Sequence, residues 1–161
     1  MNKAEVELVE KLNLFDWYVK LVLKNTCAIQ DMLRKPERKM VEKILGDLGY
    51  CCVYYPESKV YGISTKYAEI EFYCNPQLQN GDVRVHLFAQ KGNHKVGGNL
   101  ISTCRMYEIA KGKDSGKYLL SPRFRDYTQL RDILKEVLDM YEKFKVAIIE
   151  EKTFDKLSRS E

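Results

Sequence analysis

The chain has few of the residues that metal, disulfide or secretory functions need. Two histidines and five cysteines occur among 161 residues, and no two cysteines have the CxxC spacing of a zinc knuckle. No apolar run approaches the length of a membrane span, about 18 residues, and the acidic start MNKAEVELVEKL differs from a secretory signal. We therefore expect reduced cysteines, no metal, no cofactor, no membrane contact and a cytoplasmic location.

The sequence also lacks a nucleotide-binding loop, although one segment contains similar residues. GKDSGKYLLSPRFRDY begins at Gly112, and Gly116 follows after three intervening residues, where a P-loop needs four. Tyr118 occupies the position of the hydroxyl that would hold magnesium, and a strand rather than a helix is predicted to follow. The segment therefore either contacts a partner through its charges or only connects two elements.

The composition that is present is ordinary for a globular domain. Hydrophobic residues make up 45% and charged residues 31%, and a chain of this length buries enough apolar surface to fold without disulfides. We expect one domain over residues 1–150, with residues 1–33 either part of it or a helical appendage. Residues 151–161 are highly charged and are predicted to be a frayed tail.

Apolar residues at helical spacing predict helices on both sides of the chain's centre. One helix is expected over Glu5–Leu23, and a second has Pro36 in its first turn and Gly49 as its C-terminal stop. The longest is predicted over Tyr127–Ile149, with Asp126 as its N-cap and a glutamine three residues later completing a capping box.

Between these helices the apolar residues alternate, which indicates strands. The runs CCVYYPESKVYGIST, AEIEFYC and VRVHLFAQ are rich in β-branched and aromatic residues. Asn80-Gly81 predicts either a tight type I′ hairpin or a wider loop over residues 75–82. Residues 91–99 are predicted to be a mobile loop, and residues 101–110 and 117–120 to be two more strands.

This order of elements predicts an α+β fold. N-terminal helices precede an antiparallel sheet of about six strands, and the long C-terminal helix packs on one face of that sheet.

The excess positive charge lies in one segment. The net charge is +4, and residues 83–126 alone carry nine Lys or Arg against three Asp or Glu. Cations interleaved with aromatic rings suit single-stranded nucleic acid, and they also suit an acidic protein partner. Successive loops of a meander could bring them to one end of the sheet. The candidate contact residues are Lys91, Lys95, Tyr107, Lys111, Lys113, Lys117, Tyr118, Arg123, Phe124 and Arg125.

Catalysis has one weak pair of candidates, Glu71 and His86. In the wider-loop register Glu71 falls directly opposite His86, and a carboxylate that orients an imidazole is half of a general-base arrangement. We favour the simpler interpretation, an ordinary polar pair on a solvated sheet face. No nucleophile can be assigned to accompany the pair.

We therefore expect a non-catalytic binding module for a macromolecule. A protein partner is the first expectation, in an inhibitor, immunity-type or adaptor role. The alternative is a binder of single-stranded DNA or RNA that uses residues 91–125, and an enzyme that uses Glu71 and His86 is the third choice. Self-association through an edge strand is a further expectation.

Overall fold

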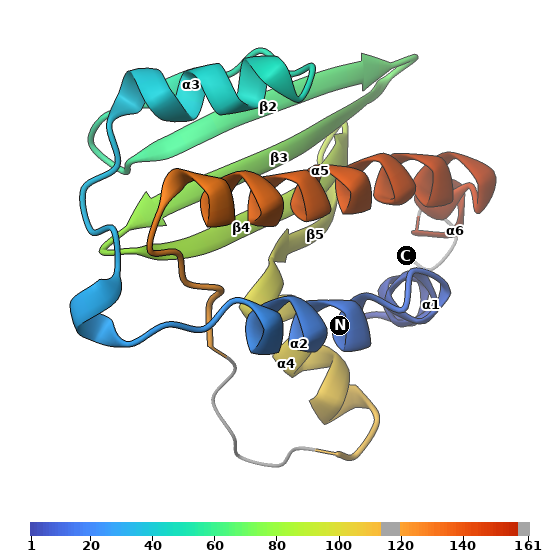
Figure 1. Cartoon of the computed structure of the whole chain (residues 1–161). Coiled ribbons are helices and arrows are strands. Elements are labelled where there is room, and N and C mark those ends of the chain that lie inside the picture. The colour runs from blue at the N-terminus through green and yellow to red at the C-terminus, as the bar shows by residue number, and fades with distance from the viewer. Residues whose placement is uncertain (114–119, 158–161) are drawn as a thin grey trace.

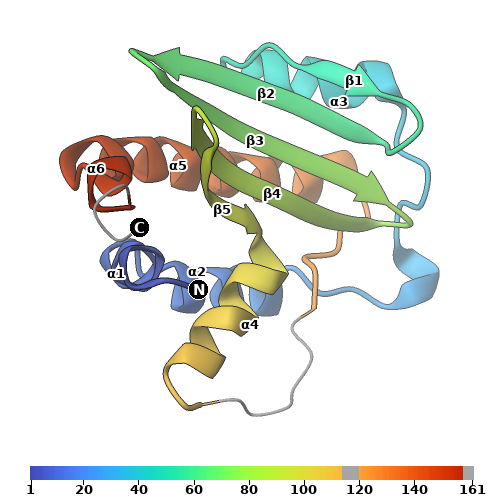
Figure 2. The same cartoon turned by 180° about the vertical axis from the view of Figure 1, so that it is seen from behind.

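The computed structural model describes residues 1–113 and 120–157 and forms two layers (Figures 1 and 2). A five-stranded antiparallel meander in the order β1-β2-β3-β4-β5 makes one layer, and helices pack on one of its faces. The α+β fold is confirmed, with five strands in the described residues where about six were expected. The elements are α1 Lys3–Lys11, α2 Leu14–Lys24, the 3₁₀ helix η1 Ile29–Asp31, α3 Arg38–Asp47, β1 Val53–Tyr55, β2 Val60–Tyr67, β3 Ile70–Gln79, β4 Asp82–Lys91, β5 His94–Asn99, α4 Leu100–Ala110, α5 Tyr127–Glu150 and α6 Thr153–Leu157.

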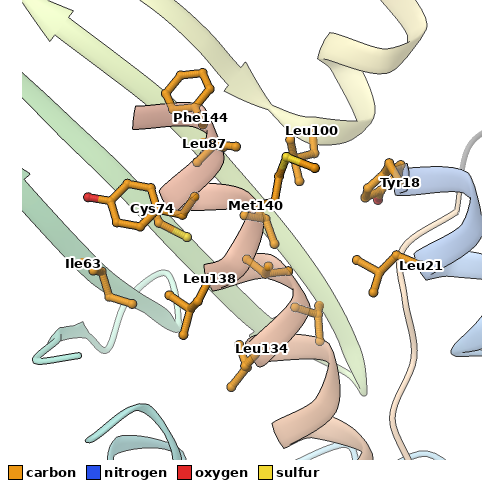
Figure 3. Packing of buried hydrophobic residues seen from close by; sticks show 14 of the residues in the cluster. Tyr18, Leu21, Ile63, Cys74, Leu87, Leu100, Leu134, Leu138, Met140 and Phe144 are labelled. Atoms are coloured by element: carbon orange, nitrogen blue, oxygen red, sulfur yellow. The ribbon is translucent and has the colours of Figure 1, made fainter. Parts of the chain in front are cut away.

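The C-terminal helix α5 forms the centre of the core, as its apolar stripe predicts. Figure 3 shows its side chains between those of the sheet and those of α2. Tyr141 fixes the helix to the sheet, because its hydroxyl donates to the carbonyl oxygen of Phe72 at 3.0 Å and lies 2.8 Å from Oγ1 of Thr65. The buried residues of the stripe are Leu130, Ile133, Leu134, Val137, Leu138, Tyr141, Phe144 and Ile148.

The N-cap of α5 is confirmed, with a shifted capping box. Oδ1 of Asp126 accepts from the backbone N–H of Gln129 at 2.8 Å. Oε1 of Gln129 accepts from the N–H of Arg125 at 3.0 Å, one residue earlier than the expected Asp126.

The predicted helix over residues 5–23 is two helices instead of one. Asn13 has a left-handed backbone with φ of 47°, which asparagine tolerates better than most residues, and it separates α1 from α2. The change of direction lets both helices bury apolar side chains, such as Leu8 of α1 and Leu21 of α2. Leu23, where the predicted helix ends, is 70% exposed.

The second predicted helix, α3, begins two residues later than its proline suggested. Pro36 lies outside the helix, because Glu37 is the N-cap and Arg38 the first helical residue. Gly49 does end it: its φ is 91°, and the following N–H of Tyr50 bonds the carbonyl oxygen of Leu45 at 2.9 Å, as in a Schellman motif.

The predictions for residues 91–110 were wrong. Residues 94–99, expected in a mobile loop, form β5, because a tight turn with Gly92 at φ 57° folds the chain back along β4. The strand expected over residues 101–110 is the helix α4. Its N-cap is Asn99, whose Oδ1 accepts from the N–H groups of Ile101 and Ser102 at 3.0 and 3.3 Å.

Two expectations concern the remaining segments. Of the strand predicted over residues 117–120, the first three residues lie outside the described part of the chain, and Leu120 is not in a strand. The predicted frayed tail is in part the short helix α6, whose Phe154 is only 4% exposed and joins the core.

The β3–β4 hairpin has the tight register. Asn80 and Gly81 both have positive φ, 55° and 84°, as a type I′ turn requires, and Gln79 pairs with Asp82. Cys74 therefore lies opposite Leu87, whereas the wider loop would have placed it opposite Val83.

Candidate binding surface on the open face of the sheet

One face of the sheet is packed against helices, and no described helix covers the other. In Figure 2 the strands lie in front and α5 lies behind them. Buried and partly exposed residues alternate along β3 and β4, as expected for a sheet covered on one side. We call the uncovered side the open face. Its central residues are Ser64, Lys66, Glu71, Tyr73, Asn75, Gln77, Arg84, His86, Phe88, Gln90, Lys95, Gly97 and Asn99.

Two aromatic rings stand at the middle of the open face. Tyr73 and Phe88 pair directly across β3 and β4, with ring centroids 4.6 Å apart and planes within 15° of parallel. Rings lying side by side in one plane could not approach so closely, so these two lie face to face. Neighbouring strands are separated by about the same distance. The ring planes must therefore stand up from the sheet, and together they form what we call the aromatic ridge.

Small residues flank the aromatic ridge on both sides. Ser64 of β2 lies opposite Tyr73, and Gly97 of β5 lies opposite Phe88. Each ring thus has one face against the other ring and one face toward a side of the ridge where the neighbouring strand contributes little bulk.

Each ring of the ridge contacts a charged side chain. The hydroxyl of Tyr73 donates to Oε2 of Glu71 at 2.6 Å, and this hydrogen bond to a carboxylate raises the pKa of Tyr73. Nζ of Lys95 lies 4.0 Å from the ring centroid of Phe88, a cation–π contact. Lys66 lies 4.0 Å from the other oxygen of Glu71.

A row of neutral polar side chains runs beside the ridge. Asn75, His86 and Asn99 lie opposite one another on β3, β4 and β5, and Nδ2 of Asn99 is 3.4 Å from Nε2 of His86. Burial and the nearby Lys95 lower the pKa of His86, so its imidazole is neutral near pH 7. Oδ1 of Asn75 is buried and has no hydrogen-bond partner among the described residues. Unmet buried acceptors are uncommon in folded proteins.

The structure does not gather the predicted basic residues. Lys91 ends β4 and lies 3.7 Å from Glu69, whereas Arg123 bridges to Asp82 at the start of β4, with 3.5 Å between Nε and Oδ1. These two positions are about 30 Å apart along the strand. Lys111, at the end of α4, pairs with Glu10 of α1. Lys95 is the only described member of the set on the open face.

The two aromatic members of that set that the structure describes, Tyr107 and Phe124, have structural roles. Phe124 is 0% exposed and belongs to the core, so it cannot contact a partner. Tyr107 packs against Phe15 of α2, with ring centroids 6.0 Å apart. Lys113 and Arg125 are exposed in the segments that flank α4 and α5. The candidates Lys117 and Tyr118 lie outside the described residues.

The tight hairpin also separates the two candidate catalytic residues. Glu71 lies opposite Gln90, and His86 lies opposite Asn75, so the pairing expected in the wider-loop register does not form. In the described residues no group of three or more His, Cys, Asp or Glu could hold a metal ion. None of the described helices is long and apolar enough to cross a membrane.

Alternation along AEIEFYC and VRVHLFAQ places Tyr73 and Phe88 on the outward face of their strands, but it does not show that the two rings pair. The signal was present, because a two-residue turn at Asn80-Gly81 fixes every pair of the hairpin, including this one.

Comparison of the chain with protein-family models, with curated proteins and with solved structures finds no match. We therefore describe the class of this protein from its own structure. The protein is an α+β domain with a five-stranded meander, helices on one face of the sheet and the aromatic ridge on the other.

Proposed function

We propose that the protein is a non-catalytic protein-binding domain whose open face is the interface. The aromatic ridge of Tyr73 and Phe88 carries this proposal. Energetically dominant interface residues are typically aromatic, central and surrounded by contacts that exclude water. The ridge stands at the middle of the sheet, and a partner with a matching depression would cover both rings and the strands on either side of them.

The charges near the ridge support a protein partner. Interface cores are depleted of charged residues relative to the rest of a surface. The row beside the ridge consists of two amides and a neutral imidazole, and Glu71 is already bonded to Tyr73. Arg84 and Lys95 are the cations of this region with no ion pair among the described residues. They favour a partner that presents acidic groups around the ridge.

Single-stranded nucleic acid is less well supported. Its bases stack on aromatic rings that present a free face. Here the two rings cover each other and Lys95 lies over the ring of Phe88, which leaves only the Ser64 side of Tyr73 for a base to stack on. The basic residues that would follow a phosphate backbone are also distributed over both ends of β4 and the end of α4.

Site-specific photocrosslinking in the cells that make this protein tests the proposal. A benzophenone amino acid replaces Gln90, which is exposed on the open face, or Lys143, which is exposed on α5. We expect the probe at position 90, and not the one at position 143, to give a discrete protein adduct. Phe88→Ala should abolish the adduct.

Tyr67→Ala is the matched control for Phe88→Ala. Tyr67 is 59% exposed, and the strand alternation places it on the helix-covered side of β2. The adduct should survive this change. An adduct that nuclease removes would indicate nucleic acid instead, and equal adducts from positions 90 and 143 would refute the proposed interface.

A further inference from the structure

A second feature lies at the border of the open face, on the helix side of β5. An open groove of about 210 Å³ is formed by α1, β5 and the start of α4, with α5 at its floor. It is larger than the roughly 150 Å³ apolar cavity that accepts benzene in a model protein. Its lining is mainly apolar. The side chains that matter here are Leu8, Leu12, Leu87, Val96, Met106 and Phe144.

The groove lies beside a free edge of the sheet. β5 is the last strand in the order, and within the described part of the chain it pairs only with β4. Among the described residues, no backbone hydrogen bond outside the strand ladder involves residues 95–99. Alternate residues of an edge strand direct their N–H and C=O groups away from the sheet, where an extended chain can pair with them.

Two glycines expose this edge. Gly97 and Gly98 line the groove and present no side chains along the middle of β5. Gly97 and Asn99 also belong to the open face, so the groove is continuous with the proposed interface. A partner that covers the aromatic ridge could therefore also contact the edge of β5, because that edge adjoins the open face.

The charge at the groove favours a peptide segment over an anionic amphiphile as its occupant. Among the described residues that line it, Glu5 has the only charged side chain, and its carboxylate already accepts from the N–H of Asn2 at 3.0 Å. A fatty acid or another anionic amphiphile would place its charge near this carboxylate, which is unfavourable. The uncharged backbone and apolar side chain of a peptide meet no such repulsion.

We propose that an extended segment of the protein partner pairs with β5 and inserts one large apolar side chain into this groove. This inference rests on the proposed function and names the part of the partner that the edge receives. Strand addition of this kind takes affinity from backbone hydrogen bonds and specificity from the pocket beside the strand.

Selection of random twelve-residue peptides displayed on phage, with the immobilised full chain as bait, tests the inference. We expect enriched peptides to contain a large apolar residue within an extended, β-branched context. Methylation of the backbone nitrogens of the best peptide around that residue should weaken its binding about tenfold or more. An unchanged affinity would exclude strand pairing.

Two glycine substitutions provide a matched pair. A Cβ at Gly98 meets no atom within 4 Å, so Gly98→Leu should fill the groove without disturbing the backbone. A Cβ at Gly46 of α3 is equally free, and Gly46→Leu is the control. Gly98→Leu should weaken the peptide about tenfold or more, and Gly46→Leu should not. If Gly98→Leu does not fold, Ser102→Trp at the rim replaces it.

The outcomes separate this inference from the proposed function. Phe88→Ala should leave peptide binding intact, because its ring is on the opposite face of the sheet. If Phe88→Ala loses the cellular partner while Gly98→Leu keeps both partner and peptide, the open face stands and the groove is excluded. Failure to enrich any groove-dependent peptide would also overturn the inference.

Discussion

The two adjacent glycines of β5 differ in whether they can accept a side chain, and this difference tests the position of β5 beside β4. Gly97 has φ of 85°, and a Cβ there would overlap the carbonyl oxygen of Leu87 and lie 3.2 Å from Cα of Phe88. A left-handed backbone costs a non-glycine residue about 1–2 kcal/mol, and forcing extra atoms into a packed site costs about 1–3 kcal/mol. Gly97→Ala should therefore lower the free energy of unfolding by about 2–5 kcal/mol.

Gly98→Ala is the matched comparison. Its Cβ meets nothing within 4 Å. Glycine within a strand is less stable than alanine by about 0.5–1 kcal/mol, so this change should be neutral or slightly stabilising. Urea unfolding followed by circular dichroism measures both variants. With a slope of about 2 kcal/mol/M, Gly97→Ala should lower the midpoint by about 1–2.5 M. Equal midpoints for the two variants would refute the placement of β5 against β4.

Three further predictions concern the core and one helix cap. Tyr141→Phe removes the hydroxyl that bonds Phe72 and Thr65. It should lower the free energy of unfolding, measured with urea, by about 1–2 kcal/mol. An unchanged free energy of unfolding would show that this hydroxyl is not buried in the core. Burial raises the pKa of Tyr141 to about 12, above the value near 10 of an unfolded tyrosine. Its contribution to stability should be complete below pH 10 and lost between about pH 10 and 12, and Tyr141→Phe should make this alkaline loss less steep. Asn99→Ala removes the N-cap of α4 and should lower the free energy of unfolding by about 1 kcal/mol. Asn93→Ala is the control, because Asn93 is an exposed asparagine in the adjoining turn.

Long and regular patterns were predictable from the sequence. The stripe of α5 continues from Leu130 to Ile148, about five turns, so a single irregular residue could not obscure it, and Asp126 marked the start of the helix. The break at Asn13 could not be seen in the same way. The apolar spacing continues through it, and only the packing of α1 and α2 against the core requires the chain to turn there.

Residues 94–110 show how tertiary context reverses local preference. GG in a polar segment suggests a loop, but at Gly97 the glycine is required by a close approach of β5 to β4. The following ISTCRMYEIA contains residues that favour strands. It becomes α4 because Asn99 caps it and because Leu100 and Cys104 turn toward the core.

The candidate site was predictable in part. Alternation along β3 and β4 assigned Tyr73 and Phe88 to the outward face, but their contact depended on which turn joins the two strands. The gathering of basic residues was wrong for a topological reason. The meander ends at β5 and residues 100–110 form α4, so Arg123 returns to the sheet at the start of β4, the end opposite Lys91.

The central claim is that the open face binds a protein through the aromatic ridge. The most direct test uses the partner protein that photocrosslinking identifies, purified without the crosslink. Its dissociation constant for the wild-type chain, Phe88→Ala and Tyr67→Ala is measured by titration calorimetry. We predict that Phe88→Ala raises the dissociation constant at least about 30-fold, which corresponds to a hot spot of about 2 kcal/mol. Tyr67→Ala should change it less than about threefold. Equal effects of the two substitutions, or no effect of either, would contradict the account.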